Sequence, residues 1–82
     1  MVDRVMEDLA DVVSVLVGSK DSFRLDVSQD DGSQWIELNL QPEDRGKVIG
    51  RRGNTVRALR TLLAARGRIE GERYELEILD PD

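Results

Sequence analysis

The chain has 82 residues, 39% of them hydrophobic and 35% charged, a composition typical of one small globular domain rather than a disordered segment. It contains no cysteine and no histidine, which excludes a disulfide scaffold, a thiolate metal site and the commonest catalytic base. The net charge is −5, and no apolar run has the length of a signal peptide or a membrane span. We therefore expect a single domain over residues 1–82, located in the cytoplasm.

The first half of the chain predicts a helix followed by a hairpin. Apolar residues recur at helical spacing from Val2 to Val17, and Gly18 marks the expected end of that helix. Apolar and polar residues then alternate over residues 23–28 and again over residues 36–41, as they do in half-buried strands. Between these two strands, Asp31-Gly32 is a favoured pair for a tight hairpin turn.

The second half predicts two more helices and a last strand. Pro42 opens a short helix that ends at Gly50. A third helix is expected from Asn54 to Ala65, with Gly67 closing it. Its predicted buried stripe consists of Val56, Leu59, Leu62 and Leu63. Alternation over residues 74–79 predicts a third strand, so the order α-β-β-α-α-β indicates an α+β domain without internal repeats or linkers.

Positive charge is concentrated in one segment of this acidic chain. Residues 45–68 hold eight basic residues and no acidic one, a local charge of +8, whereas the rest of the chain carries −13. Charge acts over a Debye length of roughly 8 Å at physiological salt, so a separate basic patch can hold a polyanion. The segment therefore predicts a phosphate-binding surface, although Glu43 and Asp44 directly before it are expected to reduce its reach.

The loop Gly50-Arg51-Arg52-Gly53 lies at the centre of the basic segment, between two predicted helices. Glycine permits unusual backbone dihedrals and lets a sugar-phosphate chain approach closely. The two arginines add forked donors that match phosphate oxygens, and the next helix begins with N–H groups that attract anions. The structural alternative is an ordinary helix–turn–helix corner, but such a corner does not require two arginines between its glycines.

This loop and its flanks resemble those of a KH domain. The (V/I)IG-x-x-G pattern is matched by residues 48–53, and the helix after it is matched by Thr55, Val56, Leu59 and Leu62. The order of elements is the type II arrangement, and the whole chain is similar to small bacterial single-KH proteins of the KhpA type. The resemblance implies a three-stranded mixed sheet with its helices on one face. It also implies a groove that clamps about four nucleotides of single-stranded RNA.

The resemblance also implies roles for individual residues. The loop from Gly50 to Gly53 would contact the RNA backbone, while Ile49, Thr55 and Val56 would floor the groove. On the adjoining strand, Ile36 or Leu38 are candidates for the same role, and Arg57 and Arg60 would extend the phosphate track. The expected RNA-binding set is Ile49, Gly50, Arg51, Arg52, Gly53, Asn54, Thr55, Val56, Arg57 and Arg60. No catalytic residue, metal site or cofactor is expected.

Some of these residues have alternative roles that the sequence leaves open. Ile49 and Val56 belong to the core, to the groove, or to both. Trp35 is either a protein-contact anchor on the sheet face opposite the helices or a side chain packed at the hairpin edge. A solvated helix face is the alternative for Arg57, Arg60, Arg66 and Arg68. A solvated strand face and tail is the interpretation of Glu70, Glu72, Glu75, Glu77, Asp80 and Asp82.

Two functions are consistent with this pattern. The first is a non-catalytic protein that binds single-stranded RNA, as an RNA chaperone or post-transcriptional regulator. The second is a dimerising protein-interaction subunit in which RNA binding is weak or secondary. For the second, the resemblance implies a homodimer or a heterodimer with a KH protein of the KhpB (Jag) type, and no membrane partner. An enzyme is not expected, because the sequence has no nucleophile elbow and no nucleotide-binding phosphate loop.

Overall fold

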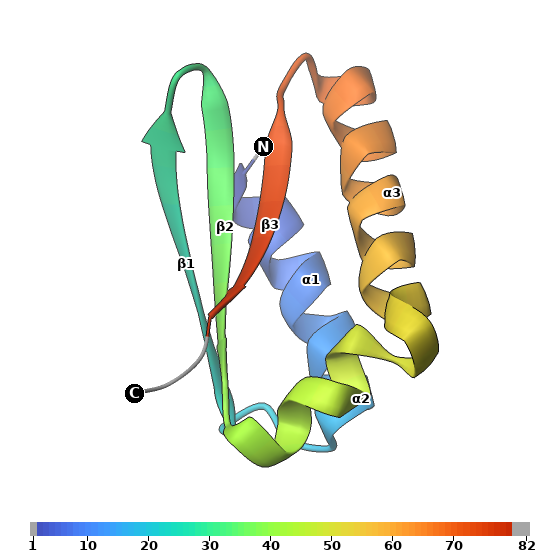
Figure 1. Ribbon diagram of the computed structural model, residues 1–82. Helices are drawn as coiled ribbons and strands as arrows, with labels where there is room; N and C mark the ends of the chain where they lie inside the picture. Colours follow the sequence, from blue (N-terminus) through green and yellow to red (C-terminus); the bar gives the residue numbers. More distant parts are fainter. Residues whose placement is uncertain (1, 80–82) are drawn as a thin grey trace.

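A computed structural model describes residues 2–79 of the chain as a three-stranded sheet with its helices packed on one face (Figure 1). The elements are α1 (Val2–Val17), β1 (Phe23–Asp30), β2 (Ser33–Leu40), the 3-10 turn η1 (Pro42–Asp44), α2 (Arg45–Ile49), the 3-10 turn η2 (Arg51–Gly53), α3 (Asn54–Glu70) and β3 (Tyr74–Leu79). The central strand β2 runs antiparallel to β1 and parallel to β3. The predicted α+β order and the mixed sheet are confirmed.

The β1–β2 hairpin closes at the predicted turn. Asp31 and Gly32 have φ angles of 53° and 79°, the positive values that a type I′ turn requires. The turn sets a register in which Leu25 pairs with Leu38 and Val27 with Ile36. Since side chains alternate between the two faces of a strand, this register puts the apolar residues of both strands on the side of the helices.

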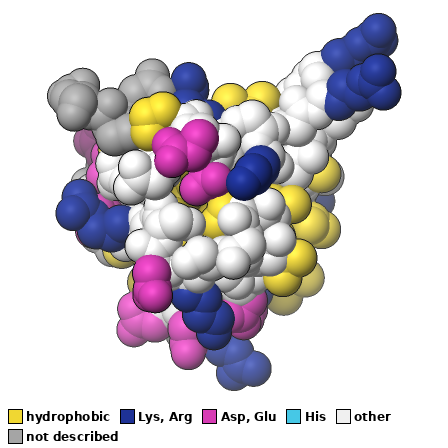
Figure 2. All heavy atoms as spheres, turned by 90° about the horizontal axis from the view of Figure 1, so that it is seen from below, with side chains coloured by type: hydrophobic (Ala, Val, Ile, Leu, Met, Phe, Trp, Pro, Cys, Tyr) yellow, Lys and Arg dark blue, Asp and Glu magenta, His cyan; other side chains and the backbone are white. Residues whose placement is uncertain are grey.

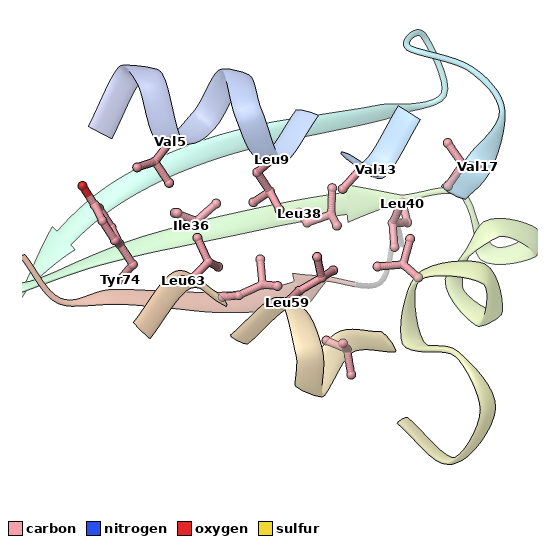
Figure 3. Packing of buried hydrophobic residues seen from close by; sticks show 13 residues of the cluster. Val5, Leu9, Val13, Val17, Ile36, Leu38, Leu40, Leu59, Leu63 and Tyr74 are labelled. Carbon is pink, nitrogen blue, oxygen red and sulfur yellow. The ribbon is translucent and has the colours of Figure 1, made fainter. Parts of the chain in front are cut away.

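The core lies between the sheet and the helices (Figure 3). Because β2 is the central strand, Ile36 and Leu38 are fully buried, whereas Val27 on the edge strand β1 is 40% exposed. The helices α1, α2 and α3 and the strands β2 and β3 contribute to this cluster, and α1 and α3 do so with residues three or four positions apart. Its buried members are Val5, Leu9, Val13, Val17, Ile36, Leu38, Leu40, Val48, Val56, Leu59, Leu63, Tyr74 and Leu76.

The helix α3 is longer than the sequence predicted. It passes through Gly67 to Glu70 and ends at Gly71, which has a φ of 72°. The prediction that Gly67 closes the helix was wrong because this glycine serves close packing instead. A Cβ at Gly67 would overlap the carbonyl oxygen of Glu72. The backbone N–H of Glu72 also donates to the carbonyl oxygen of Gly67 over 2.8 Å, which holds the two residues together. Even so, none of the helices within residues 2–79 is long and apolar enough to cross a membrane.

The predicted buried stripe of α3 also needs a correction. Leu62 is 66% exposed, and the buried residues of the helix are Val56, Leu59, Leu63 and Gly67. Consecutive helical residues are rotated by about 100°, so Leu62 points away from the sheet when Leu63 faces it. Leu62 lies instead beside Val12 of α1, which is 44% exposed, at an apolar pocket of about 250 Å³ between α1 and α3.

A polar network joins α1, α3 and β3 near the C-terminal end of α3. Arg66 Nη1 donates to Asp8 Oδ2 over 2.6 Å, and its Nε donates to Glu70 Oε2 over 2.7 Å. The hydroxyl of buried Tyr74 donates to the other carboxylate oxygen of Glu70. Glu70 of the predicted acidic run is therefore held by hydrogen bonds from Arg66 and Tyr74 rather than merely solvated, while Asp80 and Asp82 of that run lie outside the described residues.

We expect the stability of the fold to fall at both ends of the pH scale through this network. Hydrogen bonds from Tyr74 and Arg66 lower the pKa of Glu70 from 4.5 to about 2. Its contribution is therefore present above pH 4.5 and is lost as the pH falls toward 2. Burial, followed by the hydrogen bond to Glu70, raises the pKa of Tyr74 from 10.0 to about 12. Its contribution is present below pH 10 and is lost as the pH rises toward 12.

Urea unfolding between pH 2 and pH 12 measures both effects. The variant Tyr74→Phe should lose the alkaline decline. Its acid decline should be smaller and should end at a higher pH, because without the Tyr74 hydrogen bond the pKa of Glu70 lies closer to 4.5. An unchanged alkaline decline in this variant would assign the effect to another group.

Candidate nucleic-acid interface

The loop from Gly50 to Gly53 forms the corner between α2 and α3. Gly50 has φ 78° and ψ 176°, a backbone conformation found almost only in glycine. A Cβ at this position would lie 2.6 Å from the Cβ of Thr55 and 2.9 Å from its backbone nitrogen. Arg52 and Gly53 follow in left-handed conformations, with φ of 57° and 75°. The chain therefore reverses within four residues and brings the start of α3 next to the end of α2.

Arg51 and Arg52 extend from this corner into solvent. Both residues are exposed, and within residues 2–79 neither guanidinium has a hydrogen-bond or ion-pair partner. Figure 2, which views the molecule from the α2 end, shows basic side chains standing out from the rest of the surface. Each guanidinium offers five N–H donors in a planar fork, so both are available to bind phosphate oxygens.

The first turn of α3 adds backbone donors to the same corner. Gly53 precedes the helix without a side-chain cap, which leaves N–H groups of the first turn available to an anion. The side chain of Asn54 is engaged elsewhere, since its Oδ1 accepts from Arg57 Nη1 over 2.8 Å. Arg57 Nη2 lies 3.4 Å from the carbonyl oxygen of Arg52. Arg57 thus braces the loop from the next helical turn.

A groove of about 440 Å³ is lined by residues of α2, α3, β2 and β3. Figure 1 shows how these four elements are arranged. The walls of the groove are formed by Trp35, Arg45, Ile49, Val56, Arg60, Leu76, Glu77 and Ile78. Arg60 Nε and Nη2 lie 3.4 Å and 3.3 Å from the carbonyl oxygen of Leu76, and these contacts connect α3 to the free edge of β3. The groove is therefore lined by five apolar and three charged residues, with a basic loop beside it.

The family model described as "KhpA/KhpB, KH domain" matches residues 6–78, which include the loop and every wall of the groove. This chain belongs to the KhpA/KhpB family of KH domains. It is 43% identical over 79 residues to the RNA-binding protein KhpA of Aquifex aeolicus, covering 92% of this chain and 100% of that protein.

Two other KhpA proteins show a similar likeness. The chain is 44% identical over 69 residues to RNA-binding protein KhpA of Borreliella burgdorferi, which is 84% of each chain. It is 39% identical over 80 residues to RNA-binding protein KhpA of Treponema pallidum, covering 98% of this chain and 100% of the relative. All three relatives are thus named as RNA-binding proteins and match most of the present chain.

The fold brings part of the predicted set to the KH groove. Ile49, Val56 and Arg60 line it, and the loop adjoins it through Ile49. Val56 is also a buried core residue, and Ile49 packs against the core, so their two possible roles coexist. The candidates Ile36 and Leu38 were wrong, because both are fully buried on the central strand. The sheet wall of the KH groove comes mainly from β3, which is the edge strand beside α3.

Five residues of the KH groove were missed: Trp35, Arg45, Leu76, Glu77 and Ile78. Trp35 precedes Ile36, which faces the helices, so Trp35 lies on the opposite face of β2. This is the face that the first of its two interpretations predicted. Its half-buried side chain nevertheless lines the groove rather than standing apart from it. The signal that could have located the strand residues is the type II order itself, because it places the last strand next to the helix that follows the loop.

The basic segment of this KH domain is only partly available to a ligand. Lys47 Nζ donates to the buried Asp44 over 3.1 Å, and Arg66 pairs with Asp8 and Glu70. Ion pairs therefore neutralise part of the local charge of +8 that the sequence gives to residues 45–68. Folding supplies partners from adjacent helical turns and from α1. Asp44, being paired, opposes the patch less than the sequence suggested, and the cations at the loop and groove are Arg45, Arg51, Arg52, Arg57 and Arg60.

Proposed function

We propose that this protein is a non-catalytic, cytoplasmic protein that binds single-stranded RNA and acts as an RNA chaperone or post-transcriptional regulator. The observation that carries this proposal is the pair of exposed guanidinium groups of Arg51 and Arg52, which have no partner within residues 2–79 and are held between two glycines beside a partly apolar groove. The RNA-binding names of the relatives support the same class of ligand.

In this proposal the loop binds the phosphates of the RNA and the groove binds its bases. Phosphates of the strand lie against Arg51, Arg52 and the first turn of α3, and these contacts set the register of the RNA. The bases then turn toward Ile49 and Val56 in the groove. A duplex keeps its bases paired inside, so it cannot place them there, and a single strand is the form that fits.

Fluorescence anisotropy titrations with a pool of short, labelled single-stranded RNAs test this proposal, with duplex RNA of equal length as the comparison. Two phosphate contacts should give a slope of about −1.4 in a plot of log affinity against log salt concentration. Absent binding, or equal binding of the duplex, would reject the proposal.

A separate observation favours a second function, dimerisation through the face formed by α1 and α3. This face holds both a pocket of about 250 Å³ and the exposed apolar side chains of Val12 and Leu62. A two-fold interface uses the same patch on both copies, so Leu62 of one copy can enter the pocket of the other. The partner we propose is therefore a second copy of this chain, and the paired grooves would bind one RNA with higher avidity.

The variant Leu62→Glu should convert this dimer to a monomer, because it places a charge at the centre of the apolar face. Light scattering coupled to size-exclusion chromatography measures the change. Ile69→Glu is the matched control, since Ile69 is 86% exposed on the same helix and does not line the pocket. It should leave the dimer intact. A monomeric unmodified protein would reject the homodimer, and binding to a KH protein of the KhpB (Jag) type would then identify the alternative partner.

A further inference from the structure

We propose that Trp35 and Glu77 form a base-recognition subsite in the groove. In this subsite a base stacks on the indole of Trp35, and its exocyclic amino group donates to the carboxylate of Glu77. The inference rests on the RNA-binding function proposed above and adds a preference to it. Cytosine and adenine, which carry an amino group, should be bound in preference to uracil.

Trp35 supplies the stacking surface. It is the single tryptophan of the chain, and it lines the groove with a half-buried side chain while Ile36, its neighbour on β2, is fully buried. The remaining apolar walls are aliphatic and provide no flat surface; they come from Ile49, Val56, Leu76 and Ile78. Aromatic side chains in such positions stack bases with little dependence on base identity, so Trp35 accounts for affinity rather than selectivity.

Glu77 supplies the selectivity. It is the one acidic side chain among the residues that line the groove, it is exposed, and within residues 2–79 it has no hydrogen-bond or ion-pair partner. A free carboxylate repels phosphate, so it weakens backbone binding in general and contributes only as an acceptor. Cytosine N4 and adenine N6 are donors to such an acceptor. Uracil has the carbonyl oxygen O4 at the equivalent position, which the carboxylate repels.

Arg60 completes the match from the opposite wall. Its Nε and Nη2 are directed at the carbonyl oxygen of Leu76, which fixes the plane of the guanidinium at the groove. The guanidinium retains further N–H donors for an acceptor on the ligand. Cytosine and adenine each carry a ring-nitrogen acceptor next to the amino group. The Glu77 carboxylate on β3 is an acceptor and the Arg60 guanidinium on α3 is a donor. Together they suit the Watson–Crick edge of cytosine and of adenine.

The simpler interpretation is that Glu77 belongs to a solvated strand face. It does form a row with its register partner Glu37 on β2 and with Asp26 on β1. However, Glu77 alone of these three lines the groove. This difference provides a matched control, because Glu37→Gln removes the same charge from the neighbouring position without changing the groove.

The test uses short oligomers of cytidine, adenosine and uridine, with anisotropy for affinity and tryptophan emission for stacking. The unmodified protein should bind the cytidine and adenosine oligomers about tenfold more tightly than the uridine oligomer, with quenched emission. Glu77→Gln should reduce this selectivity to about twofold and strengthen binding of the uridine oligomer. Glu37→Gln should leave the selectivity unchanged. Trp35→Leu should weaken binding of all three about tenfold with the same salt slope.

A thermal melt confirms that each variant is folded, and Trp35→Phe, which retains a ring, replaces Trp35→Leu if that variant unfolds. Equal affinity for the three oligomers together with unquenched emission would overturn the subsite and leave the proposed RNA-binding function standing. Unaltered selectivity in Glu77→Gln would remove Glu77 from it. Absence of all RNA binding would remove the proposed function as well.

Discussion

Reversing both loop charges, as Arg51→Asp with Arg52→Asp, should lower the affinity for single-stranded RNA by about 100-fold or more. Two charge-assisted contacts to phosphate are lost, each worth about 1.5–3 kcal/mol, and repulsion is added. The fold should remain intact because both side chains are exposed and within residues 2–79 have no partner. Position 52 also tolerates the change, since Asp is one of the residues that adopt its left-handed conformation more readily.

The control is the same charge reversal at Arg4 and Arg68, which are exposed on α1 and on the later part of α3. This variant should lose less than about tenfold in affinity, because its charges act only through screened long-range attraction. Anisotropy titrations at several salt concentrations separate the two variants. The loop variant should lose about 1.4 from the salt slope, whereas the control should retain the slope. Equal losses would show that overall charge, rather than the loop, binds the RNA.

The substitution Gly50→Ala should destabilise the fold by about 3 kcal/mol or more. Two costs add at this position: a backbone conformation that costs roughly 1–3 kcal/mol for other residues, and the overlap of the new Cβ with Thr55. Relief of that overlap would shift the start of α3 and hence the N–H groups at the corner. RNA affinity should therefore decrease even under conditions in which the variant is fully folded.

Gly18→Ala is the matched control for this prediction. Gly18 also has a positive φ, 83°, but a Cβ there would meet nothing within 4 Å. Gly18→Ala should therefore lower the free energy of unfolding by only about 1–2 kcal/mol, which is the cost of the left-handed backbone conformation alone. Urea unfolding of both variants gives the comparison. Similar losses at the two glycines would mean that the contact with Thr55 relaxes at no cost.

The secondary structure was largely predictable because most elements bury one face. The apolar residues that face the core recur at helical spacing from Val2 to Val17 and alternate with polar residues in the three strands, so the sequence shows the buried face of each element. Predictions failed where a local signal competed with tertiary packing. Gly67 is a residue type that is common at helix ends, but here it lies inside α3, where the backbone of Glu72 leaves no room for a Cβ. Leu62 is apolar but lies outside the face that α3 turns toward the sheet.

The loop of the site was predictable because its chemistry is contiguous in the sequence. The groove was not, since its walls come from four elements and depend on which strand lies at the sheet edge. The contributions of Trp35 and Glu77 follow from that arrangement alone. In the same way, the ion pair of Arg66 with Asp8 joins residues that are far apart in the chain, so the sequence overstated the free positive charge.

The row formed by Asp26, Glu37 and Glu77 has a consequence for how much of a transcript one molecule can cover. The row starts at the groove and continues across the helix-free side of the sheet to Asp26, which pairs with Arg24, so a strand that leaves the groove in that direction meets mainly negative charge. In the proposed complex, we expect the RNA strand to turn back into solvent instead of wrapping around the protein. Many molecules can then share one transcript at close spacing, and the nucleotides between them remain free to pair with other RNA.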